Sequence, residues 1–472
     1  MPEQPAEVLG AIQHALKRSS DVVFRQIDSV TVIYVDGLVD ARTLNEFVLA
    51  PLQQNRSSLN ASSVQLPIGE IRKTDQWREA VEALLSGDAV LAWESEPDVL
   101  LLNVRGWEKR GVQEPHLEVL TKGPRDSFTE SLRTNTALVR RRVKDPHVRV
   151  ESLSLGVRSR TSTALLYIED VADPQLVDSI RSRLNAIDLD SVLDAQYVAE
   201  YFQQPRWTPF PLVISTERPD RTAAALLEGR VAVLVDNSPF AVIVPVTLPS
   251  FLISTEDYYH FPLVGSTLRW VRWTGALLTV FLPALYVVVT AVTPTLLPGR
   301  LLATVLADRE RVPYPALFEV LLMQLMMAVL VEASARLPRA IGPAATVVGG
   351  LIIGEAAARA GLISHLMIIV VAILALGAFA VPDVELSFLL RVLQWPMVAA
   401  AAFFGTYGIT LMTVVVLFHL ASLRSCGVPY LAPLAPGARG LFRDTLWRVQ
   451  WPLMSRRPEF VPARDRRRRR QP

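Results

Sequence analysis

The sequence is almost free of cysteine, since Cys426 is the only one in 472 residues. No intramolecular disulfide can form, so a small secreted disulfide scaffold and a cysteine zinc site are both excluded. The sequence also lacks a phosphate-binding glycine loop, a nucleophile elbow and histidines at metal-ligand spacing. The histidines are scattered, at His14, His116, His147, His260, His365 and His419. We therefore expect no catalytic residues, no metal and no cofactor, and we predict a protein that is not an enzyme.

A surplus of charge of one sign is missing as well. Lys and Arg number 48 against 46 Asp and Glu, so the net charge is only +2. This balance gives the chain no general attraction to nucleic acid. The first residues, Met1 to Asp21, also lack the continuous apolar core of a secretory signal peptide. We expect no nucleic-acid partner and an N-terminal half that stays in the cytoplasm.

Charged residues become sparse in the second half of the chain. Up to about Arg272 they are dense and mixed in sign, whereas few remain between Trp273 and Leu423. About 20 apolar residues in a helix are enough to cross the ~30 Å hydrocarbon core of a bilayer. The change in composition therefore predicts a soluble N-terminal half followed by an all-α polytopic transmembrane domain over residues 266–424.

The N-terminal half contains an internal repeat. Residues 31–40 and 164–173 are each a β-branched and aromatic run with an acidic turn, and each precedes apolar residues at helical spacing. Asp40 and Asp173 are placed to accept hydrogen bonds from the free N–H groups of these helices. We expect this capping role rather than cation binding.

A second pair of segments repeats too. In 83–92 and 225–234 a helix ends at glycine, Gly87 or Gly229, which suits a left-handed C-terminal cap, and a strand begins. We therefore predict an N-terminal half made of two similar α/β units. The first unit is predicted at 1–120, a charged linker at 121–145 and the second unit at 146–265.

Four stretches of the second half are predicted spans, at 273–293, 316–335, 361–381 and 397–420. A fifth, 341–358, is short for a full crossing. We expect it to be re-entrant, which is tolerated only when protein or water surrounds the backbone. Basic residues precede the first span and fill the tail, 425–472, which places both ends inside and requires an even number of crossings. Six crossings stay open if 341–358 and a piece of 293–312 both cross.

Arginines flank these stretches. The run at the C-terminus could bind nucleic acid or anionic lipid headgroups, and beside a transmembrane domain the lipid and topology role is the more typical. Arg336 and Arg339 fit an inside loop after the second span. The residues to which we assign this role are Arg269, Arg272, Arg336, Arg339, Arg466, Arg467 and Arg468.

Three acids lie within the apolar stretches, Glu319, Glu332 and Glu355. A charge at bilayer depth costs about 2.5–3.5 kcal/mol, so each needs a reason. Glu332 and Glu355 precede an arginine by four residues and can form ion pairs on one helical face. Glu319 has no such partner, although its place near the helix start could bring it to interfacial water. It is therefore the first candidate to line a water-filled cation path.

Two glycines, Gly350 and Gly354, lie four residues apart in the stretch 341–358. Small residues at this spacing let helices approach closely. The pattern is common in packed bundles and fits both tight packing and oligomerisation.

Several longer motifs follow one another along the chain. They are GPRDSFTESLRTNTALVRRR at 123–142, EGRVAVLVDNSP at 228–239, EDYY at 256–259, RLP at 336–338, VGGLIIG at 348–354 and GVPYLAP at 427–433. In this order they resemble the GerA family of spore germination proteins, A-subunit type. The resemblance runs from about residue 20 to 455.

This resemblance implies a protein of the spore inner membrane that acts in nutrient germination. Members of the family assemble with a permease-like B subunit, which is thought to bind the nutrient, and with a lipoprotein C subunit. The A subunit is thought to self-associate into a ring that conducts ions. The chain is thus expected to transduce nutrient binding into ion release.

The sequence also departs from the family pattern. Where the family usually has Glu-Ala-Gly before Arg-Leu-Pro, this chain has Glu332-Ala-Ser334, and 323–327 lacks the acids expected there. Ser adds bulk and a hydroxyl where helices meet, so gating or cation preference is expected to differ. A stage V sporulation protein AF-type paralogue and a non-conducting scaffold for a partner permease stay open. A secondary transporter is disfavoured because the membrane half shows no inverted repeat.

Overall fold

The computed structural model describes residues 5–16, 19–54, 66–93, 96–106, 115, 118, 120–335, 342–435 and 444–468. The chain divides into two compact units. Unit 1 contains both β-sheets and consists of Met1–Thr247, Arg424–Arg439 and Val449–Pro472. Unit 2 contains the long apolar helices and consists of Leu248–Leu423 and Gly440–Arg448.

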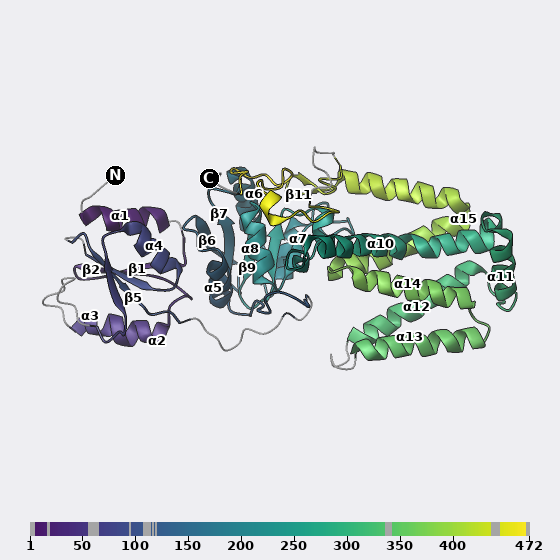
Figure 1. Ribbon diagram of the computed structural model, residues 1–472, viewed down its shortest axis with the longest axis horizontal. Coiled ribbons are helices and arrows are strands. Elements are labelled where there is room, and N and C mark those ends of the chain that lie inside the picture. The colour runs from purple at the N-terminus through teal and green to yellow at the C-terminus, as the bar shows by residue number, and fades with distance from the viewer. Residues whose placement is uncertain are drawn as a thin grey trace. The chain divides into compact units, whose positions relative to one another are not determined.

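The first sheet of unit 1 is antiparallel and has the strand order β1-β2-β4-β5-β3. Its helices cover both faces, with α1 and α4 on one side and the α2–α3 run on the other (Figure 1). The elements are α1 Pro5–Leu16, β1 Val22–Ile27, β2 Val30–Val35, α2 Ala41–Leu44, η1 Asn45–Leu49, α3 Ala50–Gln54, β3 Ile71–Thr74, α4 Trp77–Leu85, β4 Ala89–Trp93 and β5 Val99–Leu102.

The alternation of side chains along the strands explains the two cores of this sheet. Ile33 and Val35 of β2 pack with Leu84 of α4, whereas Val32, directly before Ile33, faces the opposite core with Leu52 of α3. Successive residues of a strand point to opposite faces, so a strand covered on both sides is apolar throughout.

The second sheet is antiparallel and has the order β6-β7-β9-β10-β8, which repeats the order of the first. The predicted duplication of an α/β unit is therefore confirmed. The elements are α5 Leu132–Arg142, β6 Val148–Leu155, β7 Thr161–Ile168, α6 Pro174–Asn185, α7 Ala195–Phe202, β8 Ile214–Thr216, α8 Pro219–Leu227, β9 Val231–Val235 and β10 Ala241–Val244.

The predicted helix ends are also confirmed. The Asp40 carboxylate accepts from Arg42 N and the Asp173 carboxylate from Gln175 N, so each caps its helix. Gly87 and Gly229 have φ angles of 97° and 93°, the left-handed conformation expected just beyond α4 and α8.

The segment expected to be a charged linker holds helix α5. Ser131 caps its start, Leu138 and Val139 are buried, and the helix packs against β7, β9 and α8. Ala137 on the same helix is buried in the core of the first sheet. α5 thus takes the place in the second α/β unit that α1 takes in the first. The sequence predicted a linker here because four of the eleven residues of the helix are arginines.

Part of the predicted basic tail packs on the second α/β unit. The Ser425 hydroxyl donates to Leu212 O at 2.7 Å, and Ala463 forms a β-bridge with Ala172. The remaining short elements of the tail are β11 Arg424–Ser425, β12 Val428–Pro429 and η5 Trp451–Leu453.

Unit 2 is helical. Among the described residues, three helical stretches are long and apolar enough to cross a membrane, Pro262–Val292, Ala316–Ser334 and Val384–Ser422, and His365–Ala380 is a shorter apolar helix. α10 packs against α14 and α15. The elements are α9 Leu248–Leu252, η2 Thr255–Tyr258, α10 Pro262–Val287, η3 Val288–Val292, η4 Pro294–Leu296, α11 Gly299–Arg309, α12 Ala316–Ala335, α13 Gly342–Arg359, α14 His365–Ala380 and α15 Val384–Ser422.

Two of these helices differ from the predicted stretches. The residues expected to form a re-entrant segment lie largely in α13, an unbroken helix of 18 residues. α15 consists of two helical arms, because Gly405 has φ 62° and ψ −140°. A Cβ on Gly408 would lie 1.9 Å from Ala400 O, whereas residues eight apart in a straight helix are about 12 Å apart. The chain therefore folds back at Gly405, inside the predicted span 397–420.

Candidate functional site

The start of α10 is held by a buried carboxylate, Asp257, which is fully buried. Its position is fixed by a capping box, in which Ser254 and Asp257 satisfy each other's backbone N–H groups. Arg269 Nε donates to Asp257 Oδ2 at 3.0 Å, and Arg272 Nη1 donates to Oδ1 at 2.6 Å. One turn of the chain before α10 thus binds two arginines of the helix itself.

Residues from the far end of unit 2 complete this cluster. Arg269 Nη1 donates to Asp444 O at 2.7 Å and to Oδ1 at 3.1 Å. Tyr258 OH donates to Asp444 Oδ2 at 2.7 Å, and both Arg269 and Arg448 stack on the Tyr258 ring. We call Asp257, Arg269, Arg272, Asp444 and Arg448 the Asp257 cluster.

The Asp257 cluster changes the interpretation of two predicted residues. Arg269 and Arg272 are 0% and 8% exposed, so they face protein rather than headgroups. Gly265 is also required here, because a Cβ would lie 2.7 Å from Asp257 O. The sequence indicated Arg269 and Arg272 by their charge but did not indicate Asp444 or Arg448, which lie about 180 residues further along the chain.

Glu319 lies at a second buried polar site, where α10, α12 and α14 meet. It is fully buried, and its carboxylate accepts hydrogen bonds from Tyr286 OH at 2.8 Å, Ser364 N at 2.5 Å and Ser364 Oγ at 2.6 Å. Ser364 also caps α14 by accepting from Met367 N. Glu319 of α12 therefore bonds to α10 and to the start of α14, and it is buried from solvent within the single chain.

The carboxylate of Asp308 on α11 bonds to the first residues of α14. Asp308 Oδ1 lies 2.7 Å from His365 Nδ1, and Oδ2 accepts from Leu366 N at 3.2 Å. Burial raises the pKa of Asp308, but the hydrogen bonds from His365 and Leu366 outweigh it and hold that pKa below its usual value.

The other predicted acids differ from Glu319. Glu355 bonds Arg359 at 2.5 Å as predicted, and its side chain is 55% exposed. Glu332 is exposed on α12, and its predicted partner Arg336 lies outside the described residues, as does Arg339. The three acids are therefore not gathered at one site within a single chain.

The small residues of α13 lie where it packs against neighbouring helices. A Cβ on Gly350 would lie 3.7 Å from Leu330, and one on Gly354 would lie 3.6 Å from Ile368. Both are ordinary contacts. The tightest approach is at Gly349, where a Cβ would lie 2.9 Å from Leu330 Cδ1.

The predicted tail arginines take part in local contacts of unit 1. Arg468 Nη2 donates to Glu228 Oε1 at 2.9 Å. Arg467 forms a β-bridge with Arg456, and Arg466 O accepts from Arg457 N. The Arg468 guanidinium is thus engaged with protein, whereas Arg466 is exposed.

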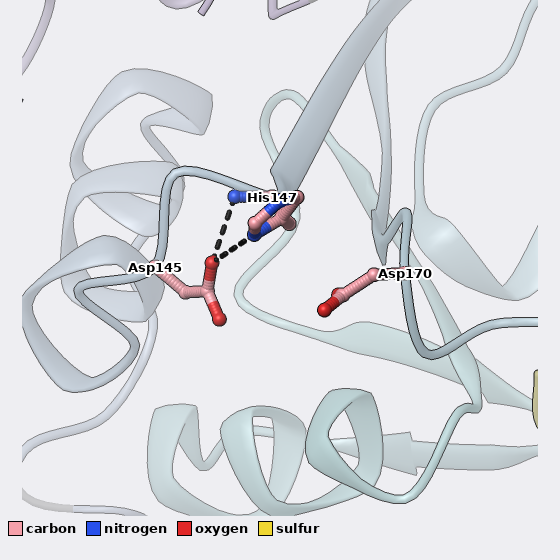
Figure 2. Close-up of side chains that lie close together, drawn as sticks. All are labelled: Asp145, His147 and Asp170. Carbon is pink, nitrogen blue, oxygen red and sulfur yellow. Dashed lines mark hydrogen bonds and ion pairs between the residues drawn. The ribbon is translucent and has the colours of Figure 1, made fainter. Parts of the chain in front are cut away.

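A group of potential metal ligands lies in unit 1, at Asp145, His147 and Asp170 (Figure 2). One ligand atom from each lies within 4.8 Å of the others. Asp145 Oδ1, however, already accepts from His147 N at 2.8 Å and lies 2.9 Å from His147 Nδ1. These bonds of Asp145 and His147 close the turn that leads into β6, and Asp170 lies exposed beside it.

Together these features define a membrane protein with tandem α/β units and a helical unit that contains buried, hydrogen-bonded charges. The family model of the Bacillus/Clostridium GerA spore germination protein matches residues 10–460. The chain therefore belongs to the GerA spore germination protein family, which is not enzymatic. The resemblance inferred from the motifs is confirmed.

Individual relatives match over nearly the whole chain. Spore germination protein KA of Bacillus subtilis is 37% identical over 95% of this chain and 85% of its own length. GerLA of Bacillus cereus is 34% identical over 97% and 96%, and stage V sporulation protein AF of B. subtilis is 34% identical over 84% and 80%. The crystal structure of the N-terminal domain of the A subunit of the Bacillus megaterium spore germinant receptor GerK3 is 31% identical. It covers 50% of this chain and 92% of that chain, with a TM-score of 0.38.

Proposed function

We propose that this chain is the A subunit of a spore nutrient germinant receptor and that it transduces nutrient binding into ion release. The observation that supports this most is the family match over residues 10–460, with near full-length relatives named spore germination proteins. In this proposal the chain lies in the spore inner membrane, with unit 1 on the cytoplasmic side. Its partners are a permease-like B subunit, a lipoprotein C subunit and further copies of itself in a ring.

The ion-conducting role is the finer part of the proposal. Charged groups within membrane segments are costly and mark ion paths or coupling sites. Glu319 is fully buried between three helices, so it is placed to report a movement of α10 relative to α14. On this view Glu319 reaches the ion path when its bonds to Tyr286 and Ser364 open.

Flux through liposomes that contain the purified assembly tests this role. We expect monovalent cation flux that depends on the nutrient and on the B subunit, and we expect Glu319→Gln to change conductance or cation selectivity. Glu310→Gln, at an exposed acid of the same unit, is the matched control and should conduct normally. Unchanged conductance and selectivity in Glu319→Gln would remove Glu319 from the path.

Two alternatives stay open: a stage V sporulation protein AF-type paralogue, and a non-conducting scaffold that couples a partner permease to release machinery. The 34% identity to stage V sporulation protein AF supports the paralogue, because it is close to the identities with the germination proteins. Conductance separates the receptor from the scaffold. Adjacent genes for a permease-like protein and a lipoprotein favour the receptor, whereas a place among stage V sporulation genes favours the paralogue.

A further inference from the structure

Unit 2 contains a cavity of about 90 Å³ between α12, α14 and α15. Most of its wall is apolar, as at Met327, Val331 and Leu374. Its volume equals that of about three water molecules at ~30 Å³ each. The cavity is partly open, because Phe379 and Trp395 on its wall are 60% and 38% exposed. The part of an occupant that enters it must therefore be small, with apolar atoms that fit these walls.

Two glutamines provide the uncharged polar part of the wall. Gln324 and Gln394 are 8% and 6% exposed, and Gln324 Nε2 donates to Gln394 Oε1 at 3.1 Å. This bond leaves Gln324 Oε1 buried without a hydrogen-bond partner. Buried acceptors in native proteins are nearly always paired, so an orphan on a cavity wall calls for a donor.

Arg391 of α15 provides a positive charge on the same wall. Its hydrogen bond is a long one, from Nη2 to Ser387 Oγ at 3.4 Å, and no carboxylate in the described residues lies within ion-pair distance of it. Arginines within membrane segments usually pair with an acid or reach the interface. An arginine on a cavity wall without a counter-ion presents a fork of donors that matches a carboxylate.

We propose that this cavity binds a small carboxylate that also carries a hydroxyl or amino group. The carboxylate bonds Arg391, the hydroxyl or amino group donates to Gln324 Oε1, and the short carbon chain fills the apolar remainder. A phospholipid phosphodiester satisfies Arg391 equally well, but it has no O–H or N–H at the phosphate and leaves Gln324 Oε1 unpaired. The orphan acceptor therefore favours the small carboxylate.

Three compounds of nearly equal size, propionate, lactate and alanine, separate the contribution of the carboxylate from that of the hydroxyl or amino group. We expect lactate or alanine to bind at least ten-fold more tightly than propionate to the full-length chain in phosphatidylcholine nanodiscs, as measured by equilibrium binding of the radiolabelled compounds. Arg391→Gln should weaken that binding at least ten-fold. Arg359→Gln, at an exposed arginine of the same unit, should leave it unchanged.

A further variant distinguishes loss of binding from loss of folding. Gln324→Glu places a carboxylate in the cavity, so it should abolish binding while Arg391 gains an internal partner and the protein keeps its thermal stability. The proposal is wrong if none of the three compounds binds, or if Arg391→Gln binds as the parent chain does. It is equally wrong if phosphatidylglycerol nanodiscs abolish binding through Arg391, because the site then belongs to lipid phosphate. None of these results bears on conductance, so the proposed function stands or falls separately.

Discussion

Arg140 in unit 1 and Arg269 in unit 2 are both buried against an aspartate, but their surroundings differ. Arg140 donates to both carboxylate oxygens of Asp21, at 2.8 and 2.9 Å, and to Ser19 Oγ at 2.6 Å. That pair is one cation with one anion. The Asp257 cluster has three arginines and two aspartates, and Arg269 Nη2 has no hydrogen-bond partner.

The difference indicates two kinds of ionic contact between chain segments. The Arg140–Asp21 pair connects α5 of the second α/β unit to the chain just before β1, and its charges cancel. The Asp257 cluster connects the start of α10 to the chain near Asp444 and has a surplus of positive charge. A balanced pair fixes its two segments in any ionic surroundings, whereas a cluster with a surplus responds to nearby anions.

The largest effect is expected for Asp257→Asn. The change removes the carboxylate that pairs with both buried arginines, so Arg272 loses its ion pair with Asp257 and Arg269 keeps only Asp444. Breaking a buried ion pair costs about 3–5 kcal/mol. We expect most of the protein to be lost as aggregate on detergent extraction, measured by size-exclusion chromatography. Glu310→Gln is the exposed control and should extract normally. Normal extraction of Asp257→Asn would show that the cluster does not hold α10.

Arg140→Ala should destabilise only the contact between α5 and the chain just before β1. It leaves Asp21 buried and unpaired, at a cost of about 3 kcal/mol. Such a loss corresponds to about 150-fold faster hydrogen exchange at Ser20 N and Val150 N, which bond across this contact. Exchange within β9 should be unaffected. Equal acceleration in β9 would mean that the two α/β units unfold together.

Glu319→Gln should have a smaller effect on stability than either change. An amide keeps one acceptor oxygen where the carboxylate offers two, so one of the donors from Tyr286 and Ser364 loses its partner. The expected cost is about 1–3 kcal/mol. Thermal unfolding in detergent measures it, with Tyr286→Phe as the reference for a single lost bond. A more stable Glu319→Gln protein would indicate that the carboxylate is strained rather than satisfied.

Arg468→Ala should have the smallest effect. Its ion pair with Glu228 is partly exposed, and such pairs contribute about 0.2–1 kcal/mol. We expect unchanged unfolding of unit 1 and only faster proteolysis of the tail, visible as early trimming by trypsin in a time course. Loss of unit 1 on trimming would show instead that the tail is part of its fold.

Much of the fold could be predicted from sequence because it depends on local patterns. The repeat, the caps at Asp40 and Asp173 and the glycines at 87 and 229 follow from residues next to one another. Helix α5 was missed because arginines dominate its sequence, and its burial depends on the distant α8. The arms of α15 were missed because a glycine in a helix does not reveal its φ angle.

The candidate sites show the same limit. Glu319 was selected by its charge in an apolar stretch, but its donors come from residues 33 and 45 positions away. The Asp257 cluster and the Gln324–Gln394 pair depend on partners more than 60 residues apart. No periodicity of the sequence encodes such pairings, which arise only when helices pack.

The reversal at Gly405 has a consequence for membrane topology. Arms of residues 384–404 and 406–422 measure about 31 Å and about 26 Å at 1.5 Å per residue, each close to one bilayer thickness. If each arm traverses the bilayer, α15 contributes a hairpin that returns to its starting face. If residues 262 and 422 also lie on one face, as the flanking arginines predict, α13 must traverse as well. The backbone angle at Gly405 would then turn the predicted four passes into six.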